Sequence, residues 1–208
     1  MTAGRWISMV ACMVLILSAG CMGLGLEREI AAKDYYLLAA KRSAQRKESV
    51  TDAAIAVMPF TVAPAYDTMQ FTYKTGQVTG KQDYYNRFFA PPGPLIAAVT
   101  RRWLSDAEVF SYVRGKANDP GCRYRLEGHV SALYGDYSGD GKATAVLELQ
   151  VFLLDRKAPD PGIVFSHEYR ETEPLAGDAP AALVKGWNSS LYHILRNFEQ
   201  DLKKELKR

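Results

Sequence analysis

Apolar and polar residues alternate along several segments of the chain and recur at helical spacing along two others. Segments 69–75, 123–133 and 143–154 alternate, which is the pattern of strands that bury one face. The nearly continuous apolar run 53–62 is too short for a good helix and contains Pro59, so it predicts a buried strand that meets an edge or a bulge at the proline. Further strands are predicted at 35–40, 83–90, 107–113 and 162–170.

Two segments have the spacing of amphipathic helices. The first follows Pro94 and places on one face Leu95, Ile96, Val99, Trp103 and Leu104. The second takes Pro180 in its first turn, with Asp178 as its predicted cap, and repeats apolar residues at steps of three and four as far as Leu206. These steps are also nearly heptad, so packing on the sheet and packing on a partner both stay open. The order of elements predicts a single α+β domain with a mixed, mostly antiparallel sheet and two principal helices, one of them C-terminal.

The N-terminal residues have the order of a secretory signal peptide. Arg5 supplies a positive charge, an apolar run follows to Leu17, and small residues precede Cys21. The run is shorter than the roughly 20 residues that span a bilayer. Small residues before a cysteine resemble a bacterial lipobox, which implies that residues 1–20 are removed, that the Cys21 thiol is diacylglycerated and that the new amino terminus is acylated. An ordinary signal peptide or an uncleaved anchor is the alternative.

Length and charge narrow the class of protein. Without the signal peptide the sequence of 208 residues keeps 188, which is enough for one domain with a core and little for two. Loss of Arg5 lowers the net charge from +3 to +2, which leaves no basic footprint for nucleic acid. Cys122 is then the one cysteine beside the acylated Cys21, so no intramolecular disulfide is expected. We therefore expect a lipidated tether at 21–34 and a domain at 35–208.

A short aromatic segment is the strongest candidate for binding. Its aromatic residues, together with one tryptophan of the first helix, form a candidate groove for lipid or for a partner protein: Tyr84, Tyr85, Phe88, Phe89 and Trp103. A role in the core is the alternative for these side chains. The charged segment 41–52 is predicted to be an exposed loop whose basic residues form a solvated surface. Attraction to anionic phospholipid, at roughly 1 kcal/mol for each cation near the surface, is the alternative.

Motifs for catalysis or metal binding are lacking in the sequence. Asp136, Ser138, Asp140 and Gly141 resemble the opening of a calcium loop, but Leu147 stands where such a loop needs a bidentate acid. Because two alternating strands flank this glycine-rich segment, it predicts a β-hairpin turn. The three histidines are far apart, and no nucleophile elbow, phosphate-binding glycine loop or zinc motif is present. We expect no catalytic residues, no metal and no cofactor.

Several motifs, taken in order, resemble one family of lipoproteins. After the lipobox come YYLL at 35–38, VMPFTVAPAYD at 57–67 and MQFTYKTG at 69–76, followed by DYYNRFFAPPGPLIAAVTRRWL and GHVSALYGDYSGDGKATAVLELQVFLLD. Together they resemble the ABC-type transport auxiliary lipoproteins, relatives of paraquat-inducible protein C that accompany MCE lipid-transport systems.

The resemblance implies a noncatalytic periplasmic subunit that works with an ABC permease and an MCE-domain protein. Such a system moves phospholipid or another hydrophobic solute between membranes. The residue directly after Cys21 is Met22 and not aspartate. This looks like the pattern that sorts lipoproteins to the outer membrane. A lipid-binding module of the same system, or an assembly lipoprotein of an outer-membrane or cell-wall machine, is the alternative. A homo-oligomer is also left open.

Overall fold

The computed structural model describes residues 32–43, 47, 49–115, 121–139, 141–158 and 162–207. The chain separates into two units, Met1–Ala32 and Lys33–Arg208, and the fold below is that of the second. The predicted signal peptide and Cys21 lie outside the described residues. The elements are, in order, β1 (Asp34–Tyr36), β2 (Thr51–Val57), β3 (Thr61–Val62), β4 (Gln70–Lys74), β5 (Gly80–Phe88), α2 (Pro92–Ala107), β6 (Phe110–Arg114), β7 (Cys122–Asp136), β8 (Thr144–Asp155), β9 (Ile163–Pro174) and α3 (Pro180–Leu206).

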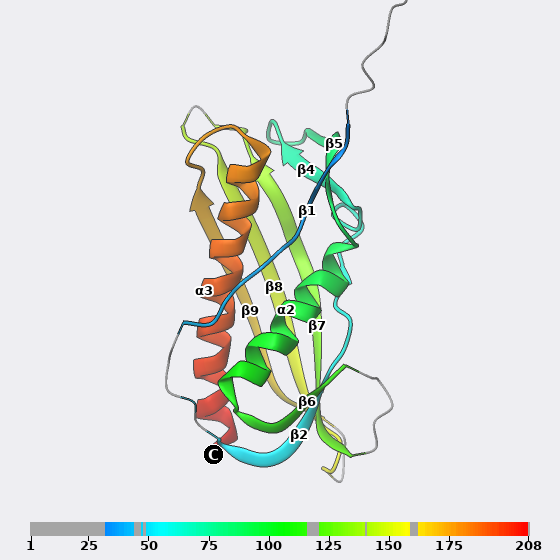
Figure 1. Ribbon diagram of the computed structural model, residues 1–208, viewed down its shortest axis with the longest axis vertical. Helices are drawn as coiled ribbons and strands as arrows, with labels where there is room; N and C mark the ends of the chain where they lie inside the picture. Colours follow the sequence, from blue (N-terminus) through cyan, green and yellow to red (C-terminus); the bar gives the residue numbers. More distant parts are fainter. Residues whose placement is uncertain are drawn as a thin grey trace, which may run out of the picture. The chain divides into compact units, whose positions relative to one another are not determined.

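Within the described residues, a nine-stranded mixed sheet is organised around β7 (Figure 1). β8 pairs with β7 in antiparallel orientation over nearly the whole length of both strands, and β9 pairs with β8 in the same way. On its other side β7 is flanked by β2, β3 and β4, which all run parallel to it. β5 and β1 extend the sheet beyond β4, and β6 extends it beyond β2. The predicted α+β class, with two helices of which one is C-terminal, is confirmed for the described part of the chain.

Pro59 divides the strand predicted at 53–62 into two. β2 ends before the proline and β3 covers only Thr61–Val62, and both pair with β7. Proline has no N–H group to donate to a ladder, so the strand is interrupted at this residue. The residue before the proline still reaches the sheet, because the N–H of Met58 donates to the carbonyl oxygen of Leu126 at 2.9 Å. The sequence predicted one strand with an edge or a bulge at Pro59, whereas the structure has two strands there.

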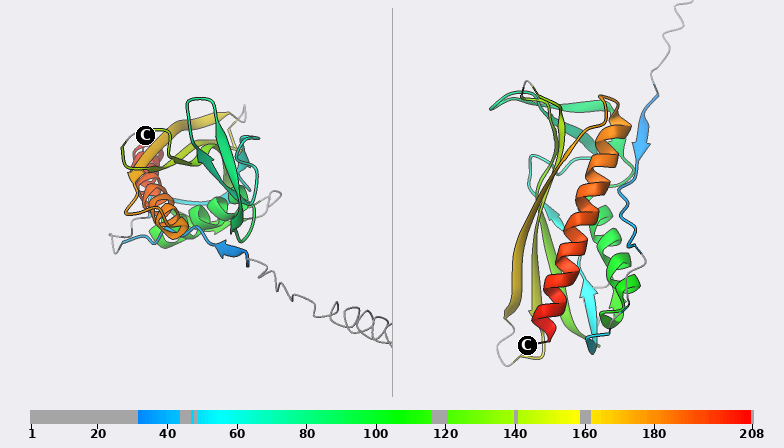
Figure 2. Two further views of the ribbon diagram at one scale, coloured as in Figure 1. Left: turned by 90° about the horizontal axis from the view of Figure 1, so that it is seen from above. Right: turned by 90° about the vertical axis from the view of Figure 1, so that its left-hand side faces the viewer.

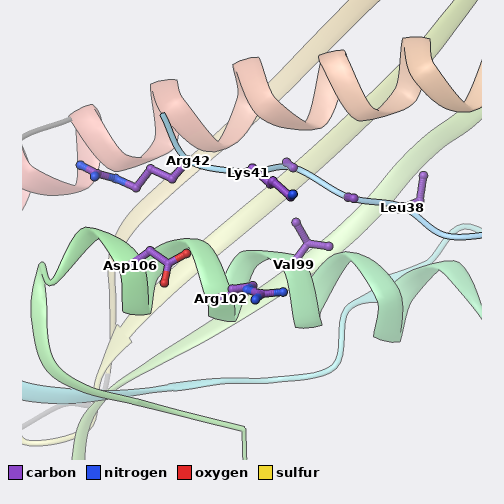
Figure 3. A pocket seen from close by; sticks show the side chains of 8 residues that line it. Leu38, Lys41, Arg42, Val99, Arg102 and Asp106 are labelled. Atoms are coloured by element: carbon purple, nitrogen blue, oxygen red, sulfur yellow. The ribbon is translucent and has the colours of Figure 1, made fainter. Parts of the chain in front are cut away.

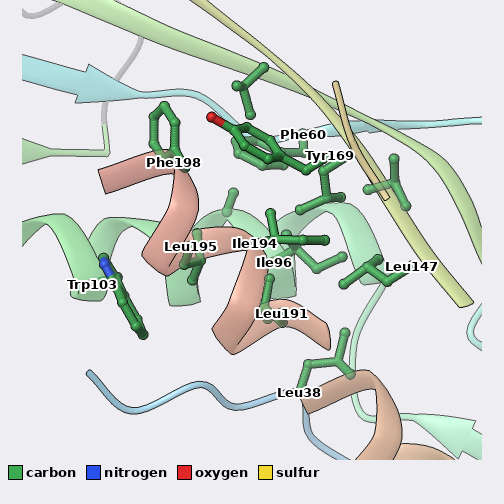
Figure 4. Close-up of a cluster of buried hydrophobic side chains, with 14 of the residues drawn as sticks. Leu38, Phe60, Ile96, Trp103, Leu147, Tyr169, Leu191, Ile194, Leu195 and Phe198 are labelled. Atoms are coloured by element: carbon green, nitrogen blue, oxygen red, sulfur yellow. The ribbon is translucent and has the colours of Figure 1, made fainter. Parts of the chain in front are cut away.

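Both helices pack on one face of the sheet (Figure 2). α2 contacts β2, β3, β6 and β7, whereas α3 contacts β8 and β9. Each helix has a proline in its first turn, as the sequence predicts. Figure 4 shows the core that lies between these layers. The buried apolar residues of α3 recur at steps of three and four: Leu183, Val184, Trp187, Leu191, Ile194, Leu195, Phe198 and Leu202.

A cluster of aromatic side chains joins α3 to β4 and β5. The ring centroid of Trp187 lies 5.0 Å from that of Phe71 on β4 and 5.3 Å from that of Phe88 on β5. Its indole N–H donates to the carbonyl oxygen of Tyr134 on β7 at 3.3 Å. All three rings of the cluster are buried. One side chain of α3 therefore holds three strands in place.

The first strand is shorter than predicted. β1 ends at Tyr36, so residues 37–40 of the predicted strand are not strand. The N–H of Ala39 donates at 2.8 Å to the side-chain oxygen of Asn188 on α3, and not to a neighbouring strand. The prediction was wrong there because a partner 149 residues away, on a helix, takes the backbone group that a strand would use.

Two predicted element ends also differ from the structure. The strand predicted at 107–113 begins only at Phe110, because α2 continues through Ala107 and ends at Glu108 in the left-handed region with a φ of 55°. Asp178 does not cap α3, since Ala179 occupies the N-cap position without a side-chain hydrogen bond. Neither difference changes the order of the elements.

The predicted hairpin of β7 and β8 is confirmed. At its turn, one carboxylate oxygen of Asp136 accepts a hydrogen bond from the backbone N–H of Ser138 at 3.0 Å, and the other accepts from the ammonium group of Lys74 at 3.3 Å. Asp140 lies outside the described residues. Among the residues that the structure describes, no three His, Cys, Asp or Glu side chains come together as a metal site.

We expect Gly186→Ala to lower the free energy of unfolding by about 1–2 kcal/mol, since overpacking costs about 1–3 kcal/mol and higher helix propensity returns only part of it. A Cβ atom at this position of α3 would lie 2.6 Å from the Cβ of Ala145 on β8. Urea unfolding followed by circular dichroism measures the effect. Gly177→Ala is the matched control, because a Cβ there meets nothing within 4 Å. A Gly186→Ala variant as stable as the wild type would show that α3 does not press on β8.

Candidate functional site

Residues 37–43, called the strap below, lie between α2 and α3 (Figure 3). Leu38 is buried in the core, and the backbone of Ala39 is bonded to Asn188 on α3. The hydroxyl groups of Ser43 and Tyr192 are 3.2 Å apart. An N-terminal segment is usually poorly ordered unless it is tied down. The strap is tied down, and β1 joins it to the segment that bears the predicted anchor.

A buried ion pair fixes the end of the strap. The guanidinium group of Arg42 donates to both carboxylate oxygens of Glu199 on α3, at 2.9 and 2.8 Å, and both side chains are at most 4% exposed. Glu199 also accepts hydrogen bonds at 2.8 Å from the indole of Trp103 on α2 and from the ammonium group of Lys203. Burial opposes ionisation of Glu199, but these four bonds outweigh it and lower its pKa to about 2. One carboxylate thus joins the strap to both helices.

The strap and α2 border a pocket of about 320 Å³, shown in Figure 3. Its lining is mixed, and consists of Leu38, Ala39, Ala40, Lys41, Arg42, Val99, Arg102 and Asp106. The apolar side chains offer contact to a hydrocarbon group, and the two exposed cations, Lys41 and Arg102, offer contact to an anion. A second pocket of about 440 Å³ lies beside β4 and the turn that follows it. Both volumes are in the range of sites for small molecules.

The five aromatic residues predicted to form a groove do not come together in one. Phe88 and Trp103 are 2% and 1% exposed and belong to the core, whereas Tyr84, Tyr85 and Phe89 are 60%, 47% and 66% exposed. None of the five lines the two pockets described above. β5 ends at Phe88, which is buried in the core, and Phe89 follows the end of the strand and is exposed.

The three exposed residues form a surface with the N-terminal segment that precedes the strap. The rings of Tyr35 and Phe89 make an edge-to-face contact with centroids 6.2 Å apart, and those of Tyr84 and Tyr85 make another at 5.2 Å. The ammonium group of Lys33 lies 4.4 Å from the ring centroid of Tyr84. Together the exposed residues are called the aromatic patch: Tyr35, Leu37, Tyr84, Tyr85 and Phe89.

Sequence reasoning missed two members of this patch, because YYLL was taken only as a strand. In the structure Tyr35 and Leu37 are exposed, while Leu38 is buried and Tyr36 packs on Phe71 with ring centroids 5.2 Å apart. The alternation of the four residues is the signal that separates an outer from an inner pair. It extends the patch from β5 onto β1.

Asp83 fixes the backbone of β5 next to Tyr84 and Tyr85. One of its oxygens accepts hydrogen bonds from the N–H groups of Tyr85 and Asn86 at 2.8 and 3.0 Å, and the other accepts from the hydroxyl of Tyr73 at 2.6 Å. The pairing of β4 with β5 shifts register at this point, so β5 bulges. Burial raises the pKa of Asp83, but the bonds from Tyr73 and Asn86 lower it more, and the carboxylate stays ionised. The bulge presents Tyr84 and Tyr85 together, although they are adjacent in sequence.

The histidines lie on three different elements of the fold. His129 on β7 is 2.8 Å from the hydroxyl of Thr61, and His193 on α3 is 3.5 Å from the carboxylate of Glu173. His167 lies on β9 among aromatic rings.

In the described ranges no helix is both long and apolar enough to cross a membrane.

Comparison with known proteins places this fold. Residues 35–197 match the family described as ABC-type transport auxiliary lipoprotein component. No curated protein matches the chain. Protein XCC0632 from Xanthomonas campestris has a similar structure, with a TM-score of 0.70 and 16% identity over 79% of this chain and 91% of that one. An uncharacterized protein has a TM-score of 0.66 and 14% identity over 82% and 99% of the two chains. The hypothetical protein CT253 from Chlamydia trachomatis has a TM-score of 0.54 and 7% identity over 75% and 98%.

At these identities the solved structures show the fold alone. The family match is more informative, because it begins at the first residue of the aromatic patch and includes the strap, the sheet, α2 and most of α3. It covers well over half of the chain. The chain therefore belongs to the ABC-type transport auxiliary lipoproteins.

Proposed function

We propose that this protein is a noncatalytic auxiliary subunit of an ABC transport system of the MCE type, which moves phospholipid or another hydrophobic solute between the inner and outer membranes. Acylated Cys21 anchors the protein at the periplasmic side of the outer membrane. Its partners are the MCE-domain protein and the ABC permease of the same system. The family match over residues 35–197 carries this proposal.

The attachment of the strap supports an anchored role. A protein held by its N-terminal lipid needs a firm connection between the tether and the folded body, because termini are otherwise loose. Here that connection is made within a few residues of the start of the domain, where the Arg42–Glu199 pair is shielded from water. A pull on the tether is thereby transmitted to both helices.

A lipid-binding module of the same system is the second candidate, and the pocket beside the strap favours it. Leu38 and Val99 would contact an acyl chain, and Lys41 and Arg102 would contact a phosphate group. This candidate predicts that the purified protein carries lipid when it is extracted and examined by mass spectrometry. A spectrum without lipid would count heavily against it.

We expect the tagged, full-length protein to recover an MCE-domain protein or its permease after mild crosslinking in intact cells. Mass spectrometry of the recovered proteins is the measurement. Cys21→Ser is the control, because it removes the thiol that carries the lipid while leaving the domain at 35–208 unchanged. Since stable anchoring takes more than one acyl chain, we expect this variant to leave the membrane fraction and to recover the partner about tenfold less.

The same experiment distinguishes the transport subunit from the third candidate, an assembly lipoprotein. Recovery of an outer-membrane or cell-wall assembly machine, without an MCE-domain protein, would contradict the transport role and favour an assembly lipoprotein. Wild type and Cys21→Ser in the same fraction would contradict the anchor.

A further inference from the structure

The aromatic patch lies where the chain enters the domain from the predicted anchor. Lys33 follows Cys21 by twelve residues, and its ammonium group contacts the ring of Tyr84. A chain of that length reaches at most about 40 Å when fully extended. The membrane that holds Cys21 is therefore within reach of the patch.

The chemistry of the patch suits the interface between lipid and water. Tyr35, Tyr84 and Tyr85 each combine an apolar ring with a polar hydroxyl group, and Phe89 and Leu37 add purely apolar surface. Tyrosine is enriched where one end of a side chain is apolar and the other is wet, as at the headgroup level of a bilayer. Exposed apolar side chains gathered on the paired strands β1 and β5 and just beyond their ends also indicate a surface that is covered in function.

The charges around the patch decide which lipid surface fits. Lys33 is a cation beside Tyr84, but the next residue, Asp34, carries an exposed carboxylate. Arg87, the register partner of Tyr35, and the ionised Asp83 add one charge of each sign. The charges at the patch therefore balance, and attraction to anionic headgroups contributes little. A zwitterionic surface is sufficient, and binding through the rings is expected to be insensitive to salt.

The patch is also rigid, which suits docking on a flat surface. Tyr36 packs on Phe71, and its hydroxyl donates to the side-chain oxygen of Asn86 at 3.1 Å. The bulge held by Asp83 fixes the backbone under Tyr84 and Tyr85. Rings that are already ordered lose little conformational entropy when they are buried.

We propose that the aromatic patch docks on the zwitterionic surface of the membrane that holds the lipid anchor of the same chain, with its rings at the level of the headgroups. This inference rests on the acylation of Cys21 in the proposed function. It adds an orientation, since the domain lies with β1 and β5 against the bilayer and does not swing freely on its tether.

The test uses the full-length lipoprotein in phosphatidylcholine vesicles with and without brominated acyl chains. Tyr84→Trp places a fluorescent side chain in the patch, while Trp103 and Trp187 are buried and give a constant background. We expect brominated lipid to lower the fluorescence of the added tryptophan at least about twofold, because interfacial aromatic side chains lie close to the acyl chains. Raising the salt concentration should leave this quenching unchanged.

Tyr112→Trp is the matched control. Tyr112 is also an exposed tyrosine on a strand, but β6 ends the strand order opposite to β1. We expect no added quenching in this variant. Adding Tyr35→Ser and Phe89→Ser to Tyr84→Trp should reduce the quenching, and since both positions are exposed, the fold is retained.

Each outcome decides the proposal. If the protein floats with the vesicles but the added tryptophan of Tyr84→Trp is not quenched, the docking is overturned and the anchor is left intact. Equal quenching of Tyr84→Trp and Tyr112→Trp has the same meaning. Protein that does not float overturns the anchor and the docking with it. If the added tryptophan of Tyr84→Trp is shielded from water only when a partner protein is present, the proposal is also overturned. Failure to recover an MCE-domain protein from cells, with quenching preserved, removes the transport role and leaves the docking in place.

Discussion

Replacement of Trp187 by alanine is expected to lower the free energy of unfolding by about 3–5 kcal/mol, the range for large-to-small changes in a core. The indole is fully buried and packs on Phe71 and Phe88, and its N–H is bonded to the carbonyl oxygen of Tyr134. Alanine would leave a cavity and remove the hydrogen bond of the indole to this carbonyl group. Urea unfolding followed by circular dichroism measures the change.

Two further variants make this result specific. Trp187→Phe keeps an aromatic ring but loses the N–H group and part of the ring volume, so we expect a smaller loss than for alanine. Tyr112→Ala removes an exposed ring, and surface changes usually stay within about 0.5 kcal/mol. If Trp187→Ala were no more destabilising than Tyr112→Ala, the aromatic cluster would not hold the sheet together.

The effect would extend to the aromatic patch. Phe88 is the inner neighbour of Phe89, and Phe71 supports Tyr36, so the cluster lies directly beneath β5 and β1. The exposed rings of the patch stay ordered because buried rings fix the strands that carry them.

Local periodicity was sufficient to predict the elements that bury one face along their whole length. β7, β8 and α3 are of this kind, since each residue of the pattern meets the same core. Their hairpin and their order followed from the turn composition. The parallel placement of β2, β3 and β4 along one side of β7 was not predictable in this way, because it depends on pairing between distant segments.

The aromatic patch was predicted only in part, for a physical reason that the segment 83–90 illustrates. Phe88 and Phe89 are the same residue type, but Phe88 is the last residue of β5 and is buried, whereas Phe89 follows the strand and is exposed. Tyr84 and Tyr85 break the alternation, because hydrogen bonds to Asp83 hold a bulge. Hydrophobicity alone therefore marks this segment as important without separating its core from its surface.

The strap was predicted as strand to residue 40 and as exposed loop from residue 41, and both predictions were wrong, since β1 ends at Tyr36 and the Arg42 side chain is buried. The partners of the strap, Asn188 and Glu199, are about 150 residues away in sequence. Trp103 was assigned to a groove on its aromatic character, whereas the carboxylate of Glu199 fixes its indole in the core. No local pattern contains this information.

Glu199→Gln is expected to lower the free energy of unfolding at pH 7 by about 3 kcal/mol, as for other buried pairs that lose one charge. The guanidinium group of Arg42 would stay buried without its counter-charge. Limited trypsin digestion reports the local effect, since trypsin cleaves after arginine and lysine residues of the strap when it opens. We expect cleavage within the strap to become about tenfold faster, because local opening becomes less costly. Glu108→Gln is the matched control, because the Lys47–Glu108 pair is more than half exposed and such pairs contribute at most about 1 kcal/mol.

The pH dependence of this difference identifies the charge itself as the cause. The pKa of Glu199 is lowered from 4.5 to about 2 in the folded protein, so its contribution is complete above pH 4.5 and is lost as the pH falls toward 2. We therefore expect the gap in unfolding free energy between wild type and Glu199→Gln to narrow from about 3 kcal/mol at pH 7 as the pH falls below 4.5. Other carboxylates titrate equally in both proteins, so they cancel in the difference. A gap that stays constant down to about pH 2.5, close to the folded-state pKa, would show that the substituted amide disturbs packing, and that the strap is not held by the ion pair.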